Sequence, residues 1–194
     1  MQITFIRHPQ TEWNILNLLQ GSKEGPISAQ GQHDAIALVE GFREDFDILF
    51  SANNSRCLYL ANLFFIRFDK QIIIDDRLNE RSFGIYEGKN TSEIASEVGW
   101  KKLTPIERIS RKPNGGESMQ DVVNKMSSFL SDVLKNPCFT NKKLVCISSG
   151  GAIKAAMYGM RCISIEKLFE IKIRNLQKLT FQSDRNGVWK LIKE

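Results

Sequence analysis

The sequence contains few of the residues that usually hold metal ions or form disulfides. Only two histidines, His8 and His33, and four scattered cysteines occur among 194 residues, and no two cysteines form a C-x-x-C pair. Two histidines argue against a histidine-rich metal site, and scattered cysteines are typical of a chain in a reducing compartment. We therefore predict neither a metal ion nor another cofactor.

Long apolar runs are also missing. The longest apolar stretches, such as LYLANLFFI at 58–66, fall well short of the roughly 20 residues that span a bilayer. The first residues, MQITFIRH, contain no basic region followed by a long apolar core, so no signal peptide is apparent. The expected location is the cytoplasm, without a membrane partner.

The excess of positive charge is small and spread along the chain. The net charge is +5, and the densest basic stretches are RISRK at 108–112 and EIKIRNLQK at 170–178. Proteins that bind nucleic acids carry clustered Lys and Arg, often interleaved with aromatic residues. We therefore expect no nucleic-acid partner, and we attribute most basic residues to a solvated surface. An anionic small-molecule substrate would explain the mild excess equally well.

Strand-like and helix-like segments alternate along the chain. Apolar and β-branched runs predict strands at 2–7, 47–51, 71–75 and 143–148. Apolar residues at helical spacing predict helices at 28–42, 55–67, 115–135 and 151–160, with short helical pieces up to about 109. The end of the chain predicts a hairpin around SDRNG. This alternation predicts one α/β domain over 1–194, a three-layer α/β/α sandwich with a mostly parallel central sheet.

Polar residues follow the predicted strands, where open α/β sheets bind their ligands. Arg7 and His8 end the first strand, and Ser149 follows the fourth. A histidine after a strand is most often structural, but a guanidinium beside it is unfavourable unless an anion lies between them. Arginine also suits bidentate phosphate binding, and Thr11 and Asn14 could add neutral hydrogen-bond donors.

Five segments, in order, resemble motifs of the histidine phosphatase superfamily, also called phosphoglycerate-mutase-like proteins. RHPQTEWN at 7–14 resembles the R-H-G-x-T-x-x-N signature, and QGSKEGPISAQGQHDA at 20–35 resembles Q-G-x-x-D-x-P-L-T-x-x-G-x-x-Q-A. The other three segments are FSANNSRCLYLA at 50–61, LNERSFGIYEG at 78–88 and PNGGES at 113–118. The resemblance spans nearly the whole chain, and it implies the phosphoglycerate-mutase-like α/β fold.

The resemblance also implies a role for each matched residue. His8 would attack phosphorus to form a phosphohistidine, while Arg7 and Arg56 would hold the phosphoryl oxygens. Glu80 would protonate the leaving alcohol and then activate water, although it could also be a surface carboxylate paired with a neighbouring arginine. Further phosphate-binding residues implied by the resemblance are Thr11, Asn14, Gln20, Gly21, Ser149 and Gly150.

The sequence departs from the family pattern at two positions. Pro9 replaces the glycine after the histidine, which removes one N–H donor. VCISSGGAIK at 145–154 resembles V-x-x-S-H-G-G-x-I-R, with Ser149 in place of the second histidine. Serine donates a neutral hydrogen bond but brings no charge, and losing a transition-state donor typically costs about 10²–10³ in rate. The sequence leaves three readings open: an engineered replacement that traps a ligand, a naturally slow phosphatase, or a phosphate-binding pseudoenzyme.

The leading interpretation is a phosphomonoesterase that hydrolyses a small phosphorylated metabolite. One alternative is phosphoglycerate-mutase-type phosphoryl transfer, for which ERISRK at 107–112 could be a reduced version of a basic segment in the longer family mutases. The compact size and the GIYEG wording at 84–88 favour the phosphatase branch. The other alternative is a non-catalytic binding or regulatory protein.

The variable segment 89–116 is expected to cover the substrate. Its charged residues could meet a second anionic group and its tryptophan an apolar one, or they could form a solvated face. The candidate specificity residues in or near this segment are Arg81, Trp100, Arg108, Arg111 and Lys112. The oligomeric state is left open, a homodimer included.

Overall fold

Within the described residues, 1–184 and 186–194, the computed structural model contains a six-stranded sheet in the order β3-β2-β4-β1-β5-β6. The strands are β1 (Gln2–Arg7), β2 (Ile48–Ser51), β3 (Ile72–Ile74), β4 (Lys143–Ser148), β5 (Lys178–Ser183) and β6 (Trp189–Lys193). Strands β3, β2, β4 and β1 are parallel, whereas β5 and β6 are antiparallel and form the predicted hairpin. The predicted, mostly parallel sheet is therefore confirmed.

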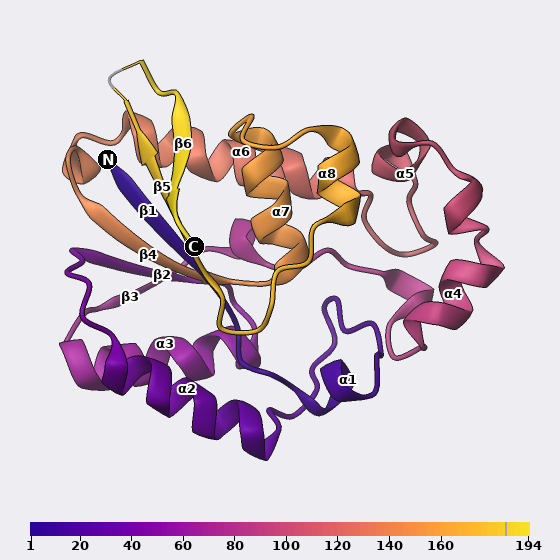
Figure 1. The fold of residues 1–194 in the computed structure, drawn as a ribbon, viewed down its shortest axis with the longest axis horizontal. Coiled ribbons are helices and arrows are strands. Elements are labelled where there is room, and N and C mark those ends of the chain that lie inside the picture. The colour runs from indigo at the N-terminus through magenta and orange to yellow at the C-terminus, as the bar shows by residue number, and fades with distance from the viewer. Residues whose placement is uncertain (185) are drawn as a thin grey trace.

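Helices cover both faces of the sheet, with α2 and α3 on one face and α6 and α7 on the other (Figure 1). The α-helices are α1 (Glu12–Ile15), α2 (Ala29–Gly41), α3 (Ser55–Phe68), α4 (Thr91–Glu97), α5 (Pro105–Ser110), α6 (Met119–Lys135), α7 (Gly150–Gly159) and α8 (Ile165–Glu170). Short 3₁₀ turns are η1 (Asp76–Leu78), η2 (Gly84–Tyr86), η3 (Trp100–Lys102) and η4 (Pro137–Phe139). This arrangement confirms the three-layer sandwich.

No helix in the described part of the chain has the length and apolar composition needed to cross a membrane.

Two helices, α1 and α8, do not follow from the sequence pattern. They contain four and six residues, which is too short for an apolar stripe to repeat. Both helices begin after an N-cap residue. The Thr11 side chain accepts a hydrogen bond from Asn14 N, and the Ser164 side chain accepts one from Lys167 N. These helices therefore depend on individual caps rather than on apolar periodicity.

The buried centre of the sheet is the pair β1 and β4. Ile3, Phe5 and Ile6 of β1 and residues 144–147 of β4 are buried, because helices cover both faces of these strands. Arg7 at the end of β1 pairs with Ser148 at the end of β4. The register therefore brings the next residues of both strands to the same edge of the sheet.

The predicted variable segment folds into α4, η3 and α5. In Figure 1 these elements lie to the right of the sheet, on the side toward which the parallel strands point. Residues that follow the strands and residues of this segment therefore share one side of the molecule.

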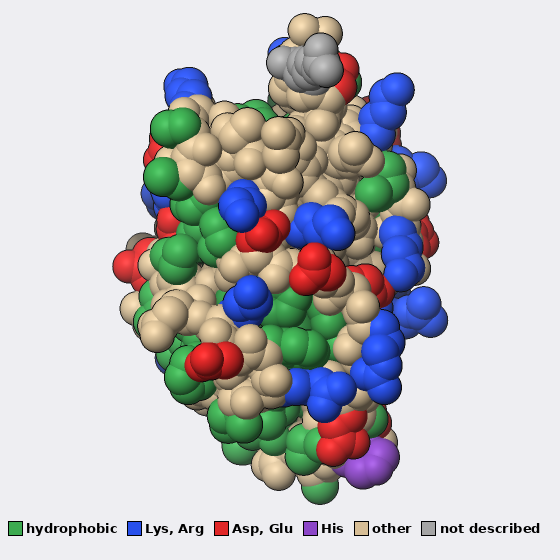
Figure 2. Space-filling model, turned by 90° about the vertical axis from the view of Figure 1, so that its left-hand side faces the viewer, with side chains coloured by type: hydrophobic (Ala, Val, Ile, Leu, Met, Phe, Trp, Pro, Cys, Tyr) green, Lys and Arg blue, Asp and Glu red, His purple; other side chains and the backbone are tan. Residues whose placement is uncertain are grey.

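Charges of both signs share the face of the molecule seen in Figure 2, which is the left-hand side of Figure 1. Apolar side chains are exposed between the charged ones. At the amino ends of β2 and β4, Lys142 Nζ lies 3.0 Å from Asp47 Oδ1. Such mixed surfaces are typical of a solvated face.

Candidate active site

His8 lies at the carboxyl end of β1, and its backbone is held by the end of β4 and by the segment that contains Asn175. Its backbone N–H donates to the Ser148 carbonyl oxygen (2.9 Å), and its own carbonyl oxygen accepts from Asn175 Nδ2 (3.0 Å). The side chain is 3% exposed. The ring is therefore fixed in a buried position at the edge of the sheet. His33, in contrast, lies in the predicted first helix, α2, and is exposed there.

The two ring nitrogens of His8 differ. Nδ1 lies 2.7 Å from the Pro9 carbonyl oxygen, and because a carbonyl only accepts, Nδ1 must carry the hydrogen. Nε2 consequently holds a lone pair. Burial, and then the nearby Arg7 and Arg56, hold the pKa of His8 well below its usual value, against the opposing effect of the Pro9 contact. The imidazole is therefore neutral at physiological pH, with Nε2 as its basic atom.

Two arginines, the half-buried Arg7 and the buried Arg56, flank this histidine. Arg7 Nη1 donates to the Ile173 carbonyl oxygen (2.7 Å), and Arg56 Nη2 donates to the Gly21 carbonyl oxygen (2.8 Å). Neither Nε atom has a partner among the described residues, although both are buried. Each guanidinium is thus anchored on backbone oxygens while retaining an N–H group. Two such cations beside a neutral imidazole favour an anion between them.

Arg56 is also supported by the loop before α2. The Glu24 carboxylate lies 3.4 Å from Arg56 Nη1 and accepts from the Ser55 backbone N–H (2.9 Å) at the start of α3. Glu24 stands where the family motif has aspartate, and its partly exposed carboxylate still reaches the arginine. The variation therefore preserves an acidic contact to Arg56.

Glu80 is held by backbone N–H groups rather than by an arginine side chain. Its Oε2 accepts from Gly151 N (3.0 Å) and its Oε1 from Arg81 N (2.8 Å). The Arg77 side chain instead pairs with Asp75 and Asp132. The Arg81 guanidinium donates to backbone carbonyl oxygens, so among the described residues Glu80 forms no ion pair with either arginine. Each carboxylate oxygen keeps a further lone pair for a proton.

Gly151 makes this position of Glu80 sterically available. A Cβ atom on residue 151 would lie 2.0 Å from Glu80 Oε1. Residue 150 has a similar relationship to Arg7, because a Cβ there would lie 3.4 Å from Arg7 Nε. The two glycines that begin α7 therefore admit the acid and one guanidinium close to the helix.

Ser149 precedes α7 as its N-cap residue but does not cap it. Its side chain is fully buried, and its Oγ atom has no hydrogen-bond partner in the described part of the chain. A buried hydroxyl without a partner normally carries a free-energy cost. The hydroxyl and the amino end of α7, with its partial positive charge, are both favourable neighbours for an anion.

The other predicted phosphate-binding residues brace the loop after His8. Thr11 Oγ1 accepts from Asn14 N (3.1 Å) and from Gln20 Nε2 (2.6 Å). Asn14 Oδ1 in turn accepts from Thr11 N (3.2 Å) and from Asn175 Nδ2 (3.1 Å). Gly21 contributes its carbonyl oxygen to Arg56. In this structure these groups form hydrogen bonds that stabilise the loop and Arg56. Their contact with phosphate stays a prediction.

A cleft of about 680 Å³ contains Arg7, Glu80, Gly150 and Gly151. It is rich in positive charge, and several of the residues that line it are absent from the sequence prediction: Lys154, Lys172, Arg174 and Asn175. Burial lowers the pKa of Lys154, and the nearby Glu80 partly opposes this effect.

The sequence contained a signal for only some of these residues. Lys154 stands at the arginine position that ends the V-x-x-S-H-G-G-x-I-R segment, so the motif could have indicated it. Lys172 and Arg174 belong to the basic stretch 170–178, which we interpreted as part of a solvated surface. Both side chains are exposed but face the cleft, so that interpretation is incomplete.

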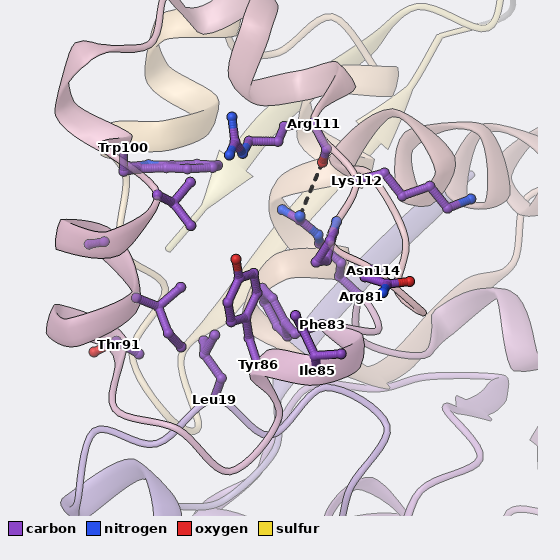
Figure 3. Close-up of a pocket in the computed structure, with 14 residues that line it drawn as sticks. Leu19, Arg81, Phe83, Ile85, Tyr86, Thr91, Trp100, Arg111, Lys112 and Asn114 are labelled. Atoms are coloured by element: carbon purple, nitrogen blue, oxygen red, sulfur yellow. Dashed lines mark hydrogen bonds between the residues drawn. The ribbon is translucent and has the colours of Figure 1, made fainter.

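The predicted specificity residues divide into two groups. Arg81, Trp100, Arg111 and Lys112 line a second cavity of about 540 Å³, which adjoins the cleft (Figure 3). Arg108 is not among the residues that line either cavity. Its guanidinium carbon lies 5.6 Å from the centre of the Trp100 ring, which indicates a stacking contact instead.

The fold and the cleft together define an α/β protein with a cationic site at the carboxyl ends of its parallel strands. Among the described residues, no group of three or more His, Cys, Asp or Glu side chains is arranged to hold a metal ion. The family model of the histidine phosphatase superfamily (branch 1) matches residues 3–193. The chain belongs to this superfamily, which confirms the resemblance found in the sequence.

Individual relatives include both mutases and phosphatases. The 2,3-bisphosphoglycerate-dependent phosphoglycerate mutase of Cytophaga hutchinsonii is 24% identical over 194 residues, covering 96% of this chain and 91% of the mutase. The phosphoserine phosphatase of Entamoeba histolytica, solved with 3-phosphoglyceric acid, is 26% identical with a TM-score of 0.86, covering 99% of this chain and 95% of that one. A mycobacterial glucosyl-3-phosphoglycerate phosphatase, solved with VO3, is 22% identical with a TM-score of 0.85, covering 98% and 96%. The structural likenesses confirm the phosphoglycerate-mutase-like fold.

Proposed function

We propose that the protein is a phosphomonoesterase in which His8 accepts the phosphoryl group and water then removes it. One observation carries the proposal: a buried, neutral imidazole with its lone pair on Nε2 lies beside two anchored guanidinium groups. This combination suits a nucleophile for a phosphoryl group whose negative charge the arginines stabilise.

The reaction proceeds in two displacements. In the first, Nε2 forms a bond to phosphorus, the bond from phosphorus to the ester oxygen breaks, and Glu80 gives its proton to the leaving alkoxide. In the second, a water oxygen attacks phosphorus, Glu80 takes a proton from that water, and the P–N bond breaks. His8 regains its lone pair, and the products are one alcohol and inorganic phosphate. Arg7, Arg56 and the Ser149 hydroxyl would stabilise the phosphoryl oxygens in both steps.

Hydrolysis of phenyl phosphate tests this function. His8→Ala should lose at least about 10³-fold in kcat, because it removes the nucleophile. His33→Ala is the matched control, since His33 is exposed on α2, and it should retain the wild-type rate. Equal rates for wild type and His8→Ala would refute the proposal. Phosphate-ester binding without any turnover would instead identify a pseudoenzyme.

A mutase function is the second candidate, and sequence similarity favours it. Curated relatives named as phosphoglycerate mutases match 96% of this chain at 24–25% identity. The size argument for the phosphatase branch is weakened, because the match covers 91% of the Cytophaga hutchinsonii mutase. Incubation with phosphoglycerate and catalytic 2,3-bisphosphoglycerate separates the two functions. A mutase would interconvert the phosphoglycerate isomers, whereas the proposed phosphatase releases inorganic phosphate.

A further inference from the structure

We propose that this site prefers phosphate monoesters whose alcohol carries an aromatic body, and that this body binds in the cavity of Figure 3. The inference rests on the proposed phosphatase function, because it assigns the leaving group of that reaction. It replaces the general expectation of a small phosphorylated metabolite with a chemical class.

The cavity has the size and the lining of a binding site for an apolar group. Its volume is about 540 Å³, within the range of about 300–1,000 Å³ that is typical of small-molecule pockets. Most of the residues that line it are apolar or aromatic, including Leu19, Phe83, Tyr86, Ile94, Val98 and Trp100. In Figure 3, Trp100 lies on one side of the cavity, and Phe83 and Tyr86 lie on the other. Aromatic rings on two sides favour a flat aromatic ligand.

The cavity is continuous with the cleft that contains Arg7 and Glu80 of the proposed reaction site. Arg81, Phe83, Thr91 and Trp100 line both spaces. Glu80, immediately before Arg81, lines only the cleft. If Glu80 protonates the ester oxygen, the rest of the alcohol would therefore extend toward these shared residues. The leaving group, and not the phosphoryl group, is the part of the substrate that can reach the cavity.

Two of the cations along the cavity wall already have partners within the protein. Arg81 is 6% exposed, and it donates to the carbonyl oxygens of Glu117 (2.7 Å) and Arg111 (3.3 Å). Lys112 Nζ lies 3.4 Å from Asp121 Oδ2, and its side chain points away from the cavity in Figure 3. These two charges therefore do not require an anion on the alcohol. Apart from Arg111, which also lines the cavity, the wall therefore favours an apolar body over a second acidic group.

A comparison of phenylpropyl phosphate with propyl phosphate tests the inference. Both esters release a primary alcohol, so the chemistry of bond cleavage is matched. The wild-type protein should favour phenylpropyl phosphate by about tenfold or more in kcat/KM, which is the size of effect expected for an added apolar group in a pocket. A ratio near one would overturn the inference.

Cavity-filling variants locate the effect. Ala95 lines the cavity from α4, and Ala95→Trp should bring the selectivity ratio close to one by occupying that space. Trp100→Ala should also lower the ratio, by removing an aromatic wall. Ala37→Trp is the matched control, because Ala37 is exposed on α2, and it should keep the wild-type ratio. If circular dichroism shows that both cavity variants are folded and both keep the wild-type selectivity ratio, the cavity is not the source of the selectivity.

A binding measurement separates failure of the inference from failure of the phosphatase proposal. Calorimetric titration of His8→Ala with the two esters requires no turnover. Tighter binding of phenylpropyl phosphate by about tenfold or more supports the cavity assignment even if wild-type protein hydrolyses neither ester. Equal affinities would overturn the assignment, whatever the activity of the wild-type protein.

Discussion

The Nδ1 atom of His8 lies 2.7 Å from the carbonyl oxygen of Pro9, and this contact distinguishes the two nitrogens of the ring. The carbonyl belongs to the residue that departs from the family's usual glycine. Proline lacks an N–H group but keeps its carbonyl oxygen, so the substitution preserves the group that selects the tautomer. The departure at Pro9 is therefore compatible with a nucleophilic Nε2.

The titration of His8 should reflect its burial. Because burial and two arginines lower its pKa well below the usual value near 6.5, the ring should stay neutral on acidification through that pH. Proton NMR of the ring C–H signals measures this directly, since the chain contains only two histidines and His33→Ala assigns them. A midpoint at or above the ordinary value would contradict the burial described here.

Glu80→Gln should slow the reaction in a manner that depends on the leaving group. For propyl phosphate, loss of the proton donor should reduce kcat by about 10²–10⁴-fold. For nitrophenyl phosphate the loss should be much smaller, because the nitrophenolate leaves without a proton. Steady-state kinetics with both esters gives the comparison. The same loss for both would exclude Glu80 as the acid.

Gly151→Ala should displace Glu80 without altering the arginines. The new Cβ would lie 2.0 Å from Glu80 Oε1, so the carboxylate must move, and a displacement of this kind can cost about 10²-fold in kcat. Gly41→Ala is the control, because a Cβ at this exposed position on α2 meets nothing within 4 Å. Kinetics with propyl phosphate should separate the two variants, and equal rates would show that the position of Glu80 is unimportant.

Ser149 offers a test in two directions. Its buried hydroxyl has no partner among the described residues, and a hydrogen bond to a charged group contributes about 1.5–3 kcal/mol. Ser149→Ala should therefore lower kcat/KM by about 10–100-fold. Ser149→His adds a donor that carries charge and should raise the rate by about 10²–10³-fold. Wild-type kinetics in Ser149→Ala would exclude the hydroxyl from the phosphoryl site.

The sequence predicted the parts of the fold that have strong patterns. The strand at 2–7 was predictable from its apolar and β-branched run, and the helix ending at Lys135 from apolar residues that repeat with the helical period. The predicted helix began at 115, whereas α6 begins at Met119, after the Ser118 cap. The helix α8 has no such repeat and escaped prediction.

The site residues that belong to sequence motifs were predictable, whereas contacts between distant segments of the chain were not. Arg7, His8 and Arg56 belong to ordered motifs, and in the structure both arginines lie close enough to the buried His8 to lower its pKa. Asn175, however, reaches the His8 carbonyl oxygen from a distant irregular segment, 167 positions away. The partner of Glu80 was equally hidden, because Gly151 contacts it through a backbone N–H group that any residue possesses.

Capture of a phosphoryl group on His8 tests the central claim most directly. Protein mixed rapidly with nitrophenyl phosphate is quenched in alkaline denaturant, in which phosphohistidine persists, and its peptides are analysed by mass spectrometry. The account predicts one phosphoryl group on the peptide that contains His8, and none on that peptide in His8→Ala. Turnover that leaves His8 unlabelled at every quench time, together with wild-type turnover in His8→Ala, would contradict it.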